Sequence, residues 1–147
     1  SAPQPTDLEQ FAQMFEGFHP EVRQQIGACP AAVTWPVLYR EPRELWGRDR
    51  IVLLGDACHP MKPHMGQGAA MAMEDAAVLS RCIVHCGDNF PEAFRLYEAL
   101  RFPRTTRVKL ESDKHEWMRH GSDCDWLYGY DAFAVSLDSP DVGTRQA

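Results

Sequence analysis

A short run of four apolar residues, Ile51 to Leu54, stands out in the pattern of hydrophobic and polar positions along the chain. An uninterrupted apolar run of this length, bounded by polar residues, is typical of a strand that is buried on both faces. Gly55 and Asp56 follow directly, so the predicted strand ends there and leaves one carboxylate at its C-terminal edge. In open α/β folds, ligands bind at that edge of the sheet.

The segment after this strand predicts a loop that leads into a helix. Prolines and glycines make the loop stiff at some positions and almost free of side chains at others. These residues are Pro60, Pro63, Gly66 and Gly68. From Ala69 onward the sequence favours a helix, and we expect its first free N–H groups to point back toward Asp56. Such an arrangement suits a polar, electron-rich ligand that carries hydroxyls and an anionic edge.

The residues before the strand predict two short helices and one further strand. Thr6-Asp-Leu-Glu9 has the form of a capping box, which opens a helix that should stop near Gly17. His19-Pro20 opens the second helix. Residues 32–40 are rich in Val, Trp, Leu and Tyr and predict a strand, which Pro36 confines to an edge or bulged position.

Residues 88–121 predict one long helix. Asp88 or Asn89 can cap it, and Pro91 sits in its first turn. Pro103 lies inside the helix and is expected to kink or interrupt it.

Three arginines follow an i, i+3 spacing within this predicted helix. They are Arg101, Arg104 and Arg107. Arginines at such positions most often make surface ion pairs, and Glu98 and Glu111 are the partners that we expect.

Composition excludes some classes of protein. The 147 residues allow one ordinary domain, and a net charge of −6 argues against a nucleic-acid surface without excluding a small anionic substrate. No run approaches the roughly 18 apolar residues of a membrane span, and no signal peptide is visible. The five cysteines are an odd number with no C-x-x-C pair, which indicates reduced thiols in a cytoplasmic protein.

Residues 55–76 follow the pattern G-D-A-x-H-P-x-x-P-x-x-G-Q-G-A…E-D-A. This run resembles the second flavin-binding motif of the FAD-dependent aromatic hydroxylases, the class A flavoprotein monooxygenases of the p-hydroxybenzoate and salicylate hydroxylase family. Two other segments are similar to the salicylate hydroxylase branch, namely Trp46-Gly-Arg-Asp-Arg50 and residues 97–104. Residues 125–131 are similar to a smaller group of enzymes within that branch.

The resemblance implies an α/β fold, namely the C-terminal part of a p-hydroxybenzoate-hydroxylase-like FAD fold with mixed strands and long C-terminal helices. In this family an N-terminal βαβ unit with a G-x-G-x-x-G run holds the FAD pyrophosphate, and the sequence contains no such run. We therefore expect a piece of a longer enzyme, in which residues 1–42 are the tail of the substrate-binding domain. Residues 43–86 would form the flavin-contacting strand, loop and helix, and residues 87–147 a C-terminal helical region.

The resemblance also assigns cofactor contacts. Asp56 would accept a hydrogen bond from a ribityl hydroxyl of FAD. Gly68, Ala69 and Ala70 would act through the backbone, with the N–H groups of the two alanines facing the flavin N1/O2 edge. Taken alone, Asp56 could simply cap the following turn, and the other three residues could be an ordinary helix start.

Pro63 and His64 are the catalytic candidates that the resemblance implies, on the substrate side of the flavin. The carbonyl of Pro63 would lie near the flavin C4a atom. His64 would bind the substrate's carboxylate or ring oxygen, since an imidazole can also transfer protons near neutral pH. A loop histidine is more often solvated or structural, and we expect His59 to hold the loop.

The implied activity is hydroxylation of a small aromatic or N-heteroaromatic acid, such as salicylate or 6-hydroxynicotinate, with loss of its carboxylate. FAD, NADH or NADPH, and O2 would take part. A non-catalytic binding or interaction module that retains the flavin-motif helix is the alternative.

A metal hydrolase using Asp56, His59 and His64 is a third reading, but the spacing of these residues matches no metal-binding signature. Zinc on Cys82, His85 and Cys86 lacks a fourth ligand, so apolar packing explains these cysteines better. We expect no metal.

The isolated chain is expected to bind FAD weakly and to be inactive, because in the family the βαβ unit supplies much of the binding free energy. Titration of FAD with the chain, followed by flavin fluorescence, measures the affinity. A micromolar dissociation constant would show that the chain is a sufficient site by itself and would contradict this expectation.

An uncovered strand at residues 51–54 should also make the isolated chain self-associate.

Overall fold

The computed structural model describes residues 2–37, 39–114 and 124–138. The chain divides into two compact units, Ser1–Val37 and Leu38–Ala147. Within the described part, helices dominate and the strands are only two residues long. No helix in those ranges is both long enough and apolar enough to cross a membrane.

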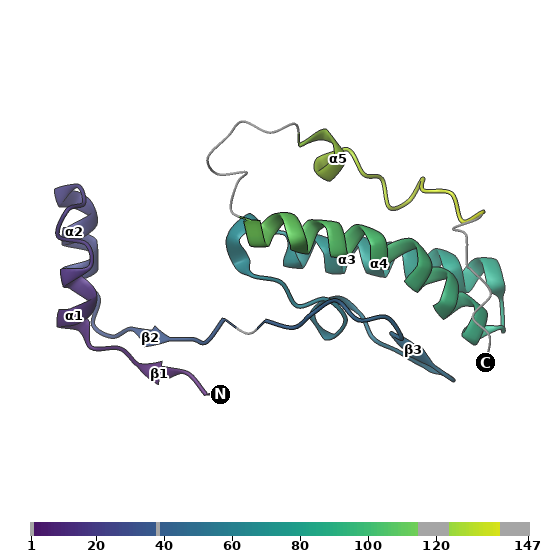
Figure 1. Cartoon of the computed structure of the whole chain (residues 1–147), viewed down its shortest axis with the longest axis horizontal. Coiled ribbons are helices and arrows are strands. Elements are labelled where there is room, and N and C mark those ends of the chain that lie inside the picture. Colours follow the sequence, from purple (N-terminus) through teal and green to yellow (C-terminus); the bar gives the residue numbers. More distant parts are fainter. Residues whose placement is uncertain (1, 38, 115–123, 139–147) are drawn as a thin grey trace. The chain divides into compact units, whose positions relative to one another are not determined.

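The first unit is a pair of helices closed by a short antiparallel ladder (Figure 1). Strand β1 (Gln4–Pro5) pairs with β2 (Val33–Thr34), and helices α1 (Leu8–Gln13) and α2 (Pro20–Gly27) lie between them in sequence. The predicted strand at residues 32–40 is thus confined to two residues. Pro36 has no N–H to donate to a ladder, which accounts for the early end.

The caps of these two helices are partly as expected. Helix α2 opens at His19-Pro20 as predicted, and Nδ1 of His19 also accepts the Glu21 N–H at 3.4 Å. The capping box at Thr6 is wrong, because Asp7 caps α1 and α1 already ends at Gln13. The hydroxyl of Thr6 instead lies 2.7 Å from that of Thr34, so it joins the two strands.

The second unit begins with a hairpin and continues as two long helices. Its elements are β3 (Gly47–Arg48), β4 (Ile51–Val52), the 3₁₀ turns η1 (Gly55–Ala57) and η2 (Pro63–Met65), and helices α3 (Gly68–Cys86), α4 (Phe90–Lys114) and α5 (Asp125–Tyr128). Strands β3 and β4 are antiparallel, and their two-residue turn places Asp49 in the left-handed region, with φ of 55°.

Helices α3 and α4 pack side by side as a hairpin that carries the core (Figure 1). Asn89 caps α4 as predicted, accepting the Glu92 N–H at 3.3 Å. The helix continues through Pro103, so the predicted interruption is wrong; residues 115–121 of the prediction lie outside the described part. An interior proline costs roughly 3 kcal/mol, and α4 keeps its course through Pro103 while it packs along α3.

The main core cluster joins helices α3 and α4 to the β3–β4 hairpin and the loop after it. Trp46 is its centre, because its ring lies 5.5 Å from both the His59 and Tyr97 rings and 6.0 Å from that of Phe102. The buried members are Trp46, Cys58, Val78, Cys82, Ala93, Phe94, Tyr97 and Ala132. The core therefore lies directly beneath the loop that follows β4.

The prediction that residues 51–54 form a strand buried on both faces is wrong for this structure. Only Ile51 and Val52 are in a strand, and the Ile51 side chain is 73% exposed. Among the described residues β4 has one neighbour, β3, so no second strand or layer covers its outer edge.

Self-association of the isolated chain through β4 remains a prediction. Ile51→Lys should shift the chain toward monomer, because a charge on an exposed edge opposes strand pairing. Val84→Lys is the matched control, since Val84 is 83% exposed but lies on α3, away from any strand edge. Sedimentation over a concentration series gives the measurement. A wild-type chain that stays monomeric throughout would contradict the prediction.

Candidate functional site

One buried carboxylate, that of Asp75 on α3, connects the loop after β4 to both long helices. Its Oδ2 accepts the Gly55 N–H at 3.1 Å and lies 2.6 Å from Nε2 of His59. Its Oδ1 accepts the Nε–H of Arg101, on α4, at 2.7 Å. His59 therefore holds the loop, which confirms the prediction for this residue.

Sequence reasoning assigned no role to Asp75, although a signal was present. The buried residues of α3 are Met71, Asp75, Val78 and Cys82, which fall on one helix face. A carboxylate on an otherwise apolar stripe must find partners inside the protein, because an unpaired buried charge is very costly.

The predicted surface ion pairs of the α4 arginines are also wrong for Arg101 and Arg104. Arg101 is fully buried, with Nη1 2.7 Å from Oε2 of Glu74 in addition to its bond to Asp75. Arg104 binds Glu74 through two parallel bonds of 2.7 and 2.8 Å. The cause is helix packing, since α3 presents two consecutive acidic residues to the face of α4.

Arg107 pairs with an aromatic ring instead. Its guanidinium lies 3.9 Å from the ring centroid of Trp126, which comes from α5. Arg104 also donates to the backbone carbonyls of Trp126 and Leu127, at 3.1 and 2.9 Å. These arginines therefore fasten α5 to the helix hairpin.

The charges in this cluster follow from competition between burial and pairing. Burial alone would raise the pKa of Asp75, but hydrogen bonds from His59 and Arg101 outweigh burial and lower it. Burial alone would lower the pKa of Arg101, yet its bonds to Asp75 and the nearby Glu74 raise it. Both groups are therefore charged at neutral pH.

Two neighbouring groups stay protonated. Burial, with the nearby charge of Asp75, raises the pKa of the Cys58 thiol to about 12. Burial, again with Asp75, also raises the pKa of the Tyr97 hydroxyl far above its usual value. The thiol is thus not a nucleophile at neutral pH.

The turn at η1 is pressed tightly against α3. Gly55 has φ of +62°, and a Cβ there would lie only 3.1 Å from Cβ of Ala72, so a side chain at this position would be strained on both counts. Arg40 holds the turn from its other side, donating to the carbonyls of Ala57 and Cys58 at 2.7 and 3.0 Å.

Asp56 lies in this turn, exposed, beside the start of α3. A Cβ at Gly68 would lie 3.7 Å from Oδ1 of Asp56, so the structure brings these two residues together. Gln67, which precedes the helix, makes no side-chain cap. The first N–H groups of α3, those of Gly68, Ala69 and Ala70, thus begin the helix next to a carboxylate without a capping side chain.

Pro63 and His64 lie in η2, which is fastened to α4. Nζ of Lys109 donates to the Pro60 carbonyl at 3.1 Å, and Nζ of Lys62 lies 3.3 Å from Oδ1 of Asp113. Pro63 is exposed and His64 is half-buried. The Pro63 carbonyl accepts the Gly66 N–H at 3.0 Å, which leaves its second lone pair for another donor.

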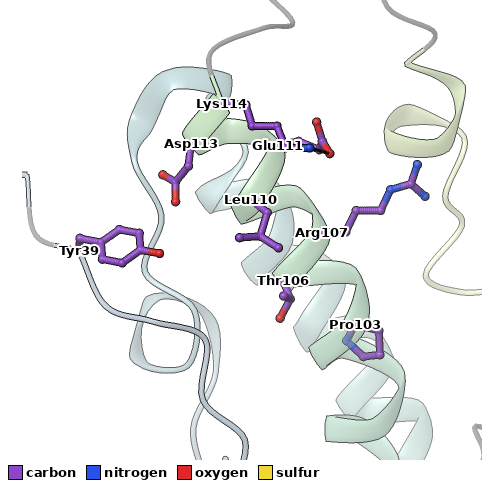
Figure 2. A pocket seen from close by; sticks show the side chains of 8 residues that line it. All are labelled: Tyr39, Pro103, Thr106, Arg107, Leu110, Glu111, Asp113 and Lys114. Carbon is purple, nitrogen blue, oxygen red and sulfur yellow. Dashed lines mark hydrogen bonds and ion pairs between the residues drawn. The ribbon is translucent and has the colours of Figure 1, made fainter.

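An open groove lies along α4, where Tyr39 faces the helix (Figure 2). It is lined by Tyr39, Pro103, Thr106, Arg107, Leu110, Glu111, Asp113 and Lys114. None of the residues that the sequence proposed for the site contributes to this lining. Two basic and two acidic side chains line it, so the groove has no single charge preference.

The described residues support neither of the two alternative metal sites. Within residues 2–37, 39–114 and 124–138, no three His, Cys, Asp or Glu side chains are placed to hold a metal ion. Cys82 is buried in the core while His85 is exposed, so the two do not share a surface. Burial, the largest cause, raises the pKa of Cys82 to about 11.

Comparison with known proteins places this arrangement among flavoproteins. A family model described as FAD binding domain matches residues 32–110. The 6-hydroxynicotinate 3-monooxygenase of Pseudomonas fluorescens is 49% identical over 135 residues, which are 91% of this chain and 35% of that protein. The 3-hydroxybenzoate 6-hydroxylase of Klebsiella oxytoca is 44% identical over 100 residues, 68% of this chain and 25% of that protein.

A solved structure shows the same likeness. The crystal structure of an HpxO variant from Klebsiella pneumoniae, complexed with FAD, matches with a TM-score of 0.62 at 29% identity. The match covers 84% of this chain and 34% of that one. The chain thus spans between 25% and 35% of the length of these relatives.

Replacing Asp75 should destabilise the chain in a pH-dependent way. Asp75→Asn leaves Arg101 without its full counter-charge, and removing one partner of a buried pair costs about 3–5 kcal/mol. The folded pKa of Asp75 lies below the unfolded value of about 4, so its contribution is present above that pH and is lost as the pH falls through the folded pKa.

Urea unfolding of both proteins at pH 7, 4 and 3 tests this prediction. The difference in unfolding free energy between wild type and Asp75→Asn should be largest at pH 7 and shrink toward pH 3. A difference that stays constant across this range would mean that the charge of Asp75 is not what stabilises the fold.

Proposed function

The chain belongs to the FAD binding domain family, and from this premise we propose that it forms the flavin-contacting C-terminal part of an aromatic monooxygenase. The family resemblance in residues 55–76 is thereby confirmed, since the matched range includes all of them. The observation that carries the proposal is the position of Asp56 beside the uncapped start of α3. The proposed division into residues 1–42, 43–86 and 87–147 follows from the same resemblance.

The residues at this position fit the cofactor. Asp56 is exposed and can accept a hydrogen bond from a ribityl hydroxyl of FAD, and a charged acceptor makes such a bond roughly twice as strong as a neutral one. The N–H groups of Ala69 and Ala70 begin a helix of 19 residues, so their end of the helix is positive and favours the electron-rich edge of the flavin. Gly68 keeps the helix start free of a side chain beside Asp56.

On the substrate side we propose Pro63 and His64. The bound flavin supplies the oxygen chemistry, driven by NADH or NADPH as electron donor and O2 as oxidant. His64 would bind and orient the substrate and hold a proton at the substrate's oxygen, while Pro63 would shape the space beside the flavin ring.

The proposed substrate is a small aromatic or N-heteroaromatic acid. The names of the two relatives support this class, since one acts on 6-hydroxynicotinate and the other on 3-hydroxybenzoate. We favour 6-hydroxynicotinate because the likeness to that enzyme extends over 91% of the chain. We further propose that the whole enzyme acts in the cytoplasm.

Asp56→Ala and His64→Ala should fail in different ways in the full-length protein. Loss of a charge-assisted hydrogen bond of about 1.5–3 kcal/mol should weaken FAD binding about ten- to a hundredfold in Asp56→Ala. His64→Ala should keep its flavin, and its Michaelis constant for the aromatic acid, or the coupling of NAD(P)H oxidation to hydroxylation, should suffer.

Flavin titration and steady-state kinetics with a peroxide assay separate the two results. Asp88→Ala and His85→Ala are the matched controls, because both residues are exposed; His85 lies in the last turn of α3 and Asp88 two residues after the helix ends, away from its start. If His64→Ala loses flavin but hydroxylates normally once FAD is restored, the proposed placement of this loop is wrong.

A further inference from the structure

We propose that Asp75 is the positioning residue of the flavin site, holding Asp56 and the start of α3 at a fixed separation without contacting the ligand. This inference rests on the proposed function. Asp75 is fully buried, so it cannot itself reach a cofactor at the surface. Its effect must pass through the loop that it holds.

The bonds of Asp75 fall on both sides of Asp56. Gly55, the preceding residue, gives its N–H to Oδ2, and His59, three residues later, binds the same oxygen. The turn between them is closed by the N–H groups of Cys58 and His59, which donate to the Gly55 carbonyl at 2.9 and 3.0 Å. Asp56 thus projects from a closed turn whose two ends meet at one oxygen atom.

Asp75 is also connected, through the helix itself, to the N–H groups of Ala69 and Ala70 at the start of α3. Asp75 and Ala70 belong to one continuous helix, five residues apart, which corresponds to about 7.5 Å along its axis. The carboxylate therefore sets the distance between the oxygen of Asp56 and the N–H groups of Ala69 and Ala70. If the Asp56 carboxylate and these N–H groups both bind FAD, the cofactor must span the distance between them.

A carboxylate suits this position better than an amide. Asp75 accepts from three donors, those of Gly55, His59 and Arg101, whereas an Asn side chain offers one acceptor oxygen. Arg101 keeps the carboxylate charged in the interior and, coming from α4, fixes its orientation. Substitution by Asn should therefore loosen the turn even when the helices stay packed.

The chain offers a matched control in Glu98. Its two carboxylate oxygens accept the N–H groups of Leu45 and Trp46, at 2.9 and 2.8 Å, so it also fastens a loop backbone to α4. That loop precedes β3 and contains no residue of the proposed site. Glu98→Gln thus removes the same kind of interaction at another place.

The first experiment uses the full-length protein without any ligand and measures amide hydrogen exchange by NMR. In Asp75→Asn the amides of Gly55, Cys58 and His59 should exchange about tenfold faster than in the wild type, relative to the amides of α4. In Glu98→Gln the amides of Leu45 and Trp46 should respond instead. Equal protection of the turn in both variants would overturn the proposal.

His59→Phe keeps the positioning test decisive if Asp75→Asn does not fold. Phenylalanine can retain the ring contact with Trp46 while it removes the bond to Asp75, and the Asp75–Arg101 pair stays in place. Faster exchange at Gly55 and Cys58 in this variant would support the proposal. Exchange rates equal to the wild type would overturn it.

The second experiment measures FAD affinity and the visible circular dichroism of bound flavin in the full-length protein. Asp75→Asn and His59→Phe should weaken binding about 10- to 100-fold, the range seen when residues that orient metal-ligating side chains are replaced, and should change the dichroism. Glu98→Gln should do neither, although it lowers stability.

Asp56→Ala separates the failure of this inference from the failure of the proposed function. If Asp56→Ala weakens FAD binding while Asp75→Asn and His59→Phe do not, the positioning role is wrong and the flavin site stands. If all three variants bind FAD like the wild type, the flavin site itself is misplaced and the inference falls with it.

Discussion

The ion pair between Asp75 and Arg101 is the constraint on which the second unit depends. Both side chains are fully buried, so each needs the other to offset its loss of hydration. A buried pair of this kind adds little net stability compared with apolar residues of the same size, but it tolerates only one arrangement of its partners. It therefore fixes the register of α3 against α4, and with it the place where the loop of His59 can dock.

The same logic extends outward from the pair to the end of the described chain. Glu74 binds both Arg101 and Arg104, and Arg104 in turn holds the backbone of residues 126 and 127. Arg81 does the same further along, donating to the carbonyls of Ala132 and Val135 at 2.9 and 2.7 Å. These charged side chains thus connect four segments, namely the loop at residues 55–59, α3, α4 and residues 126–135. The apolar core supplies the hydrophobic free energy.

Local features of the fold could be predicted from the sequence, and features that depend on distant partners could not. The start of α2 at Pro20 and the cap at Asn89 were predictable because proline suits the first turn of a helix and the free N–H groups there need an acceptor within a few residues. The close approach of Asp56 to the start of α3 followed from a strand, a glycine loop and a helix in that order. The exposure of Ile51 depends on which strands lie beside it, and the partners of Arg101 depend on which face of α4 meets α3, so neither could be derived from spacing alone.

The bonds of Asp75 all lie within one continuous stretch of the chain, residues 55–101. Its bonds to His59, Gly55 and Arg101 span 16, 20 and 26 residues. Short loops are cheap to close, and folds dominated by such contacts form quickly. Closing the cluster around this carboxylate therefore needs no residue outside that stretch. Formation of the turn that carries Asp56 is thereby coupled to the docking of α3 on α4, rather than to pairing between strands.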